Sequence, residues 1–102
     1  MSPEPPFRTG TSVMTCGIRN RLERDSLFAM FIIDIFNRHK NCDWGDVDDE
    51  DREMNNHSVQ SEKEGNPSDM ILSSYRHTDG TEVWIITNAD RKATTILYPD
   101  EY

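Results

Sequence analysis

The sequence predicts one α+β domain in which two helices pack on a small antiparallel sheet. One segment has the three-and-four spacing of an amphipathic helix, and the last third of the chain has three segments rich in β-branched and aromatic residues. The length of 102 residues suits one domain. We therefore expect a single core over residues 11–102, preceded by a disordered, proline-rich segment over residues 1–10.

The first regular element is expected over Thr11 to Cys16, where β-branched residues favour a short strand. Gly17 follows this strand and favours a turn. We expect the strand to join the sheet that is formed by the end of the chain.

The clearest helical pattern runs from Asp25 to about His39. Its inner face is predicted to hold Phe28, Phe31, Ile32, Ile35, Phe36 and His39. Asp25 or Ser26 can accept a free amide hydrogen bond at the helix start. Met30 and Ile33 fall outside this face, so they are either covered by a second layer or form a candidate apolar interface.

A second helix is expected from Asp48 to about Gln60, because carboxylates in a first turn oppose the positive end of the helix dipole. The segment from Ser61 to Ser68 contains glycine, proline and charged residues, and it is predicted to be an exposed loop.

Three strands are predicted after this loop, over Met70 to Arg76, Glu82 to Asn88 and Ala93 to Tyr98. Turn sequences separate them, so they should form an antiparallel meander. Alternation places apolar side chains on both faces of the sheet. One face can pack on the long helix, and the other needs a cover, either the second helix or a partner.

The net charge of −8 is concentrated between Asp43 and Glu53, where seven carboxylates accompany one arginine. Such a segment repels nucleic acid and attracts basic protein surfaces, so we expect a protein partner and no direct nucleic-acid binding. The predicted partner-binding residues are Asp43, Trp44, Asp46, Asp48, Asp49, Glu50, Asp51 and Glu53. Trp44 has two interpretations: it packs over the end of the long helix beside a turn at Gly45, or it is an exposed interface anchor.

No catalytic, metal or cofactor site is predicted. The acidic segment lacks the glycine and glutamate spacing of an EF-hand, and Cys16, His39, Cys42 and His57 lack the compact spacing of a structural zinc site. The sequence also lacks the nucleophile and phosphate-binding motifs that are common in enzymes. The enzymatic alternative is a small metal-dependent hydrolase or nuclease that uses the carboxylates from Asp46 to Glu53, in particular Asp46, Asp48, Asp49 and Glu50.

Several segments resemble a family of small acidic proteins found on plasmids, conjugative elements and related mobile DNA. They include Asn37-Arg38-His39, Asp43-Trp44-Gly45-Asp46, Asp79-Gly80-Thr81, Trp84-Ile85-Ile86-Thr87 and Pro99-Asp100-Glu101-Tyr102. The resemblance covers most of the chain and implies an accessory protein of a mobile element, without an agreed biochemical activity. Together with the charge, it leads us to expect a DNA mimic that inhibits host restriction or CRISPR machinery by occupying a basic, nucleic-acid-binding surface. A further alternative is a regulatory subunit that binds through Met30, Ile33 and the uncovered sheet face.

A cytoplasmic location without membrane contact is expected. Residues 1–6 lack the apolar region of a secretory signal, and the longest apolar run begins at Leu27 and spans ten residues, against the roughly 20 that cross a bilayer. Two cysteines are too few for a secreted disulfide scaffold. The sequence leaves the oligomeric state open.

Overall fold

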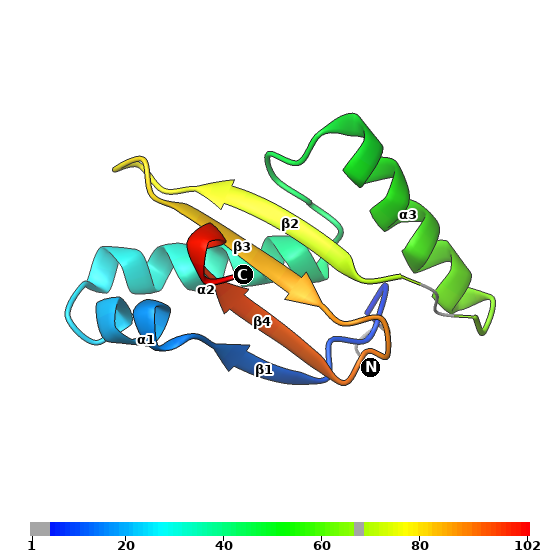
Figure 1. Ribbon diagram of the computed structural model, residues 1–102, viewed down its shortest axis with the longest axis horizontal. Coiled ribbons are helices and arrows are strands. Elements are labelled where there is room, and N and C mark those ends of the chain that lie inside the picture. Colours follow the sequence, from blue (N-terminus) through cyan, green and yellow to red (C-terminus); the bar gives the residue numbers. More distant parts are fainter. Residues whose placement is uncertain (1–4, 67–68) are drawn as a thin grey trace.

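The computed structural model describes residues 5–66 and 69–102, and it confirms the α+β fold. The elements are β1 (Thr11–Met14), α1 (Cys16–Leu22), α2 (Ser26–Lys40), α3 (Asp49–Lys63), β2 (Ile71–Arg76), β3 (Glu82–Thr87), β4 (Ala93–Leu97) and the 3-10 turn η1 (Pro99–Glu101). The sheet order is β1-β4-β3-β2. Strand β1 runs parallel to β4, so the sheet is mixed, while β2, β3 and β4 form the predicted antiparallel meander (Figure 1).

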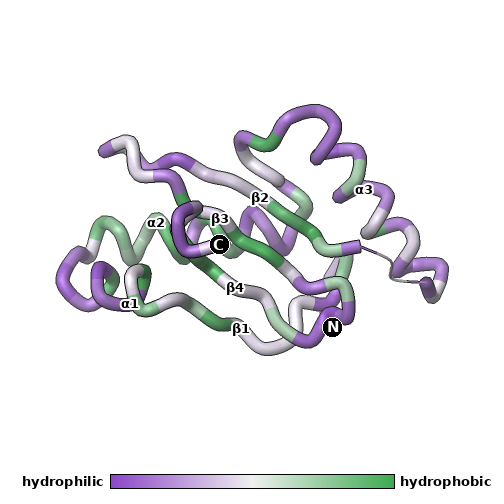
Figure 2. Tube along the Cα trace, viewed as in Figure 1, coloured by the Kyte–Doolittle hydropathy of each residue, from purple (hydrophilic) through white to green (hydrophobic). Residues whose placement is uncertain are grey.

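The main core lies between α2 and one face of the sheet. Phe28, Ile32 and Ile35 are buried on the inner face of α2, as their spacing predicts. They pack against sheet residues that include Ile85 and Ile96, which are paired across β3 and β4. Figure 2 shows apolar stretches in β3 and in α2. Phe31 and Phe36, which were predicted on the same face, are only half-buried at its flanks.

Both predicted helices begin at aspartate caps. Asp25 accepts a hydrogen bond from the Phe28 amide at 3.0 Å, and Asp48 accepts one from the Asp51 amide at 2.8 Å. Helix α3 continues to Lys63, so the loop that was predicted from Ser61 begins later. Residues 67 and 68 of that loop lie outside the described residues.

The first strand is shorter than predicted, and helix α1 replaces the turn expected at Gly17. Ile18 and Leu22 are one helical turn apart, and both pack into the main core. Gly17 lies close to the end of the chain, since a Cβ there would lie 2.7 Å from Oε2 of Glu101. Burial of the inner side of a short helix therefore outweighs the local turn signal of glycine.

Residues 5–10, before β1, are ordered, which differs from the expectation of disorder over residues 1–10. Phe7 is 1% exposed, and its ring centroid lies 5.4 Å from that of His39 and 5.8 Å from that of Trp44. The carbonyl of Thr9 accepts a hydrogen bond from Oγ1 of Thr94 at 2.7 Å. Burial of the Phe7 side chain helps to fix residues 5–10, while residues 1–4 lie outside the described part of the chain.

The second face of the sheet is not covered by α3. This helix lies beside β2, at one edge of the sheet, while η1 lies over the second face (Figure 1). Trp84 on that face packs edge-to-face on Tyr102, with 6.0 Å between the ring centroids. Among the described residues, no helix has both the length and the apolar character needed to cross a bilayer.

Candidate functional site

The acidic segment is joined to the sheet edge by a tight turn at Gly45. The Ser74 amide donates to the Trp44 carbonyl at 3.1 Å, and the Asp46 amide donates to the Ser74 carbonyl at 2.7 Å. Gly45 has a φ of +70°, and a Cβ on it would lie 2.0 Å from the Ser74 carbonyl oxygen. Only glycine fits this position, so the start of the acidic segment is held in register with β2.

Asp43 uses its carboxylate within the chain. Its Oδ2 accepts a hydrogen bond from Nε of Arg38 at 2.8 Å, and its Oδ1 accepts one from the Gly45 amide at 3.2 Å. The Arg38 guanidinium lowers the pKa of Asp43 below the usual range of a carboxyl group. Asp43 therefore stabilises the turn at Gly45, and Arg38 neutralises much of its charge at the surface.

The other carboxylates divide into partnered and unpartnered groups. Asp48 caps α3, and Asp49 pairs with Nη1 of Arg52 at 2.9 Å. Within the described part of the chain, four predicted site residues have side chains that make no hydrogen bond or ion pair. These are Asp46, Glu50, Asp51 and Glu53. Asp51 is half-buried and the other three are exposed, so they are the carboxylates most available to a partner.

Helix α3 is attached to the sheet through Asn55. Nδ2 of Asn55 donates to the Leu72 carbonyl at 2.6 Å, and Oδ1 accepts from the Leu72 amide at 3.2 Å. The side-chain amide thus occupies the place of a neighbouring strand at the outer edge of β2. An edge that is covered in this way is closed to further strand pairing.

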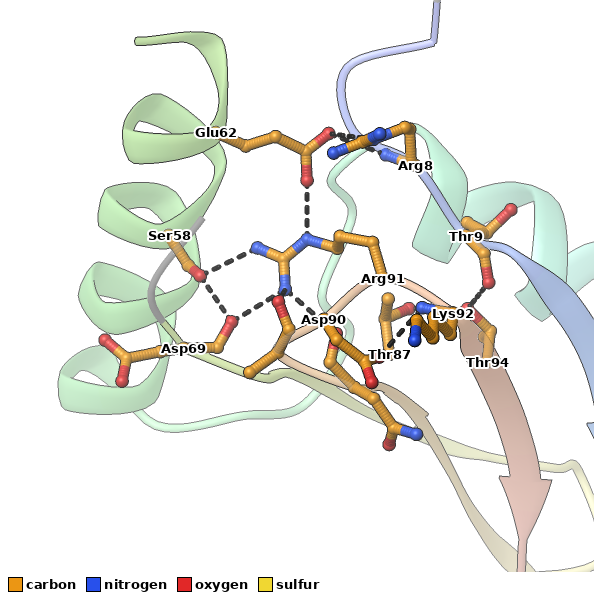
Figure 3. Close-up of polar contacts among 12 residues, drawn as sticks. Arg8, Thr9, Ser58, Glu62, Asp69, Thr87, Asp90, Arg91, Lys92 and Thr94 are labelled. Carbon is orange, nitrogen blue, oxygen red and sulfur yellow. Dashed lines mark hydrogen bonds and ion pairs between the residues drawn. The ribbon is translucent and has the colours of Figure 1, made fainter. Parts of the chain in front are cut away.

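A second attachment is made by Arg91, in the turn between β3 and β4 (Figure 3). Its Nε donates to Oε1 of Glu62 at 2.5 Å, its Nη2 donates to Oγ of Ser58 at 3.0 Å, and its Nη1 donates to the Asp69 carbonyl at 2.8 Å. The Arg91 backbone has a φ of +60°. The sequence showed only a turn here, because an arginine among polar residues has the signature of an exposed side chain.

Trp44 does not belong to the exposed surface, which corrects its place among the predicted partner-binding residues. Only 4% of it is exposed, and its Nε1 donates to Oδ1 of Asn56 at 2.9 Å. Its ring packs on His39 at the end of α2, with 5.8 Å between the centroids. The packed interpretation of Trp44 is therefore confirmed.

His39 lies in a buried chain of hydroxyl groups. Its Nδ1 is 2.5 Å from Oγ of Ser73, and its Nε2 is 2.9 Å from Oγ1 of Thr87. Oγ1 of Thr87 is in turn 2.8 Å from that of Thr94, which donates to the Thr9 carbonyl. Because the Thr94 hydroxyl donates to Thr9, its oxygen accepts the hydrogen bond from the Thr87 hydroxyl. The Thr87 oxygen therefore accepts a hydrogen bond from Nε2 of His39.

These directions fix the imidazole tautomer. Nε2 carries the proton, and Nδ1 accepts from the Ser73 hydroxyl. Burial lowers the pKa of His39 to about 3, so the ring is neutral at physiological pH. His39 and Ser73 are fully buried, and a serine in this position cannot reach a substrate. The pair is structural.

The residues weighed as zinc ligands are dispersed. Cys16 is exposed on α1, Cys42 is half-buried after α2, and His57 is exposed on α3. Both ring nitrogens of His39 are engaged in the hydroxyl chain. Among the described residues, no three His, Cys, Asp or Glu side chains are grouped closely enough to hold a metal ion, and this includes the carboxylates of the hydrolase alternative.

The candidate apolar interface lies at the surface. Met30 is 66% exposed and Ile33 is 64% exposed, so no second layer from the described residues covers them.

Comparisons of the chain with protein-family models, curated proteins and solved structures found no match. Function therefore has to be inferred from the residues of this chain.

Proposed function

We propose that the chain is a non-enzymatic interaction protein whose acidic α3 start occupies a basic surface of a nucleic-acid-binding protein. One observation supports this most strongly: Asp46, Glu50 and Glu53 are exposed and have no partner among the described residues, at the start of an anchored helix. In this proposal the partner is a cytoplasmic host restriction or CRISPR protein, and binding inhibits it.

The spacing of charge along the helix start suits a surface that binds phosphates. Five carboxylates and Arg52 lie from Asp48 to Glu53, so this stretch has a net charge of −4. At a rise of about 1.5 Å per residue it spans about 7.5 Å, which is about one net charge per 1.9 Å. Double-stranded DNA carries about one charge per 1.7 Å of its axis. The similarity is limited to this short stretch, so we propose that it replaces a few successive phosphates of a DNA contact.

The rigidity of α3 supports the same proposal. Asn55 and Glu62 connect the middle and end of the helix to the sheet, and Asp48 caps its start. Charges on a fixed helix lose little conformational freedom when a partner binds, so more of their interaction energy is available for affinity.

The resemblance to mobile-element proteins adds biological context. Arg38, Trp44 and Gly45 belong to the segments that carry it. Trp44 and Gly45 lie in the loop that precedes Asp46, and Arg38 of α2 donates to Asp43 of the same loop. A mobile element that encodes such a protein would gain protection from host defence. We therefore propose that the chain inhibits a defence protein, and not that it binds basic proteins in general.

The proposal is tested by affinity capture from a host lysate with two triple variants. The first replaces the unpartnered carboxylates, as Asp46→Asn, Glu50→Gln and Glu53→Gln. The control makes the same change in net charge at exposed sites elsewhere, as Glu23→Gln, Asp34→Asn and Asp100→Asn.

Quantitative mass spectrometry should show the same nucleic-acid-binding protein with the wild type and the control, and its loss with the first variant. Equal capture by all three chains, or equal loss in both variants, would contradict a specific role for the acidic start of α3.

A further inference from the structure

Strand β1 leaves one edge of the sheet open. Within residues 5–66 and 69–102 it is the terminal strand in the sheet order and pairs only with β4. The amides of Thr11 and Thr15 donate to β4-side carbonyls at 2.9 and 3.1 Å, so alternate residues face β4. The backbone groups of Ser12 and Met14 therefore point outward. Residues 11–18 contain neither charge nor proline, the two features that commonly protect an edge strand from pairing.

An apolar groove of about 240 Å³ runs beside this edge, between β1 and α2. It is lined by Ser12, Met14, Ile32, Ile33, Phe36, Asn37 and Ile96. None of the described residues that line it is charged, and Met14 is 40% exposed. The open edge and the groove thus offer hydrogen-bonding groups and apolar surface to the same occupant.

We infer that this occupant is a second copy of the chain, with the two β1 strands paired antiparallel about a two-fold axis at Val13. The two sheets then form one continuous sheet. The site is separate from the acidic surface of α3, so it does not depend on the proposed function.

The register is self-complementary. A two-fold axis at Val13 places Ser12 of each copy opposite Met14 of the other, and such a pair exchanges both backbone hydrogen bonds. All outward amides and carbonyls of the two residues are then bonded. Ser12 and Met14 pair with Thr94 and Ile96 and line the groove together with Ile33, so in this arrangement the paired side chains of the two copies lie next to the groove. The same patch serves both copies, as a two-fold interface requires.

The charge distribution permits this pairing despite a net charge of −8 on each copy. The acidic helix α3 lies beside β2, at the opposite end of the sheet order (Figure 1). Three strand spacings of about 4.8 Å separate β1 from β2, or about 14 Å, which exceeds a screening length of about 8 Å at physiological salt. A basic partner would be attracted to α3. The uncharged edge of β1 can instead pair with the equally uncharged β1 of a second copy.

The mass in solution tests this inference by light scattering up to millimolar protein. The wild type should approach twice 11.8 kDa as its concentration rises. Ile33→Lys places a charge in the groove and should remain a monomer. Leu27→Lys is the matched control, because Leu27 is 69% exposed on the same helix and does not line the groove. This control should dimerise like the wild type.

A backbone variant tests the register. Ser12→Pro removes only an outward amide and should also give a monomer. In the wild type, amide hydrogen exchange at Ser12 and Met14 should slow as concentration rises, while Val13, whose amide faces β4, should change little. A wild type that stays monomeric, or a dimer that survives both Ile33→Lys and Ser12→Pro, would overturn the inference. Binding of a different protein in the groove of a monomeric chain would do the same.

Discussion

Nε of Arg91 donates to Oε1 of Glu62 at 2.5 Å, and the two side chains are 1% and 10% exposed. This contact joins the turn between β3 and β4 to the last turn of α3, across 29 positions of sequence. It explains how a helix with a very polar sequence is held beside the sheet. Oε2 of Glu62 also accepts from the Arg8 amide at 2.8 Å, so one carboxylate fixes three segments.

Removal of the Glu62 charge should therefore destabilise the fold. Glu62→Gln leaves the buried Arg91 guanidinium without its counter-charge, and we expect the free energy of unfolding to fall by about 3 kcal/mol. Glu64→Gln, at an exposed position one residue after α3, should change it by less than about 0.5 kcal/mol. Urea denaturation measures both. A Glu62→Gln midpoint equal to that of the wild type would show that this pair does not anchor α3.

The buried His39 should make stability depend on pH. Its pKa of about 3 in the folded chain is below the ordinary value of 6.5, so between these values the unfolded chain binds a proton that the folded chain does not. The contribution of the neutral His39 to the free energy of unfolding is therefore fully present above pH 6.5. It is lost as the pH falls from 6.5 toward 3, by about 1.4 kcal/mol per pH unit.

His39→Gln keeps an amide that can donate to Thr87 and removes this titration. Its unfolding free energy should vary less with pH than that of the wild type between about pH 5 and 6.5, above the range in which ordinary carboxyl groups titrate. His57 and His77 remain in both proteins, so the difference between the two curves reports on His39. Parallel curves would contradict a neutral, buried imidazole.

Gly45 should be far less tolerant of substitution than Gly80, although both have positive φ values of +70° and +92°. Alanine at Gly80 meets no atom within 4 Å, so it should cost about 1–2 kcal/mol for the backbone conformation alone. Alanine at Gly45 adds a clash with the Ser74 carbonyl, and the loop must leave β2. Thermal melts should rank wild type, Gly80→Ala and Gly45→Ala in that order. Equal losses would mean that the Ser74 contact is unimportant.

Much of the fold could be predicted because local patterns and burial agree. The inner face of α2 and the strands of the meander follow from periodicity, and the strand ends lie within one residue of their predicted positions. Helix α1 was missed because it has only seven residues and contains a glycine, so its signal comes from tertiary packing of Ile18. Phe7 was missed for the same reason, since one apolar residue between Pro6 and Arg8 has no periodicity.

The charge of the candidate surface could be predicted from the sequence, but the partners of its individual side chains could not. Composition located the acidic segment, but only the structure separates Asp43, which pairs with Arg38, from Asp46, which has no partner among the described residues. Trp44 could be buried or exposed on the basis of sequence, and the Asn56 hydrogen bond determines the outcome. The attachment by Arg91 depends on residues from three distant segments, and no local pattern encodes it.

Competition with DNA measures most directly whether the acidic start of α3 takes the place of nucleic acid. Fluorescence anisotropy of a labelled duplex, bound to the captured host protein, is followed while the chain is added. We predict that the wild type displaces the duplex at a fixed salt concentration, and that its own binding to the host protein weakens as salt rises to physiological strength. The Asp46→Asn, Glu50→Gln, Glu53→Gln variant should need at least about tenfold more protein, or about 1.4 kcal/mol of lost binding free energy. A duplex that stays bound while the chain binds beside it would contradict the proposed mimicry.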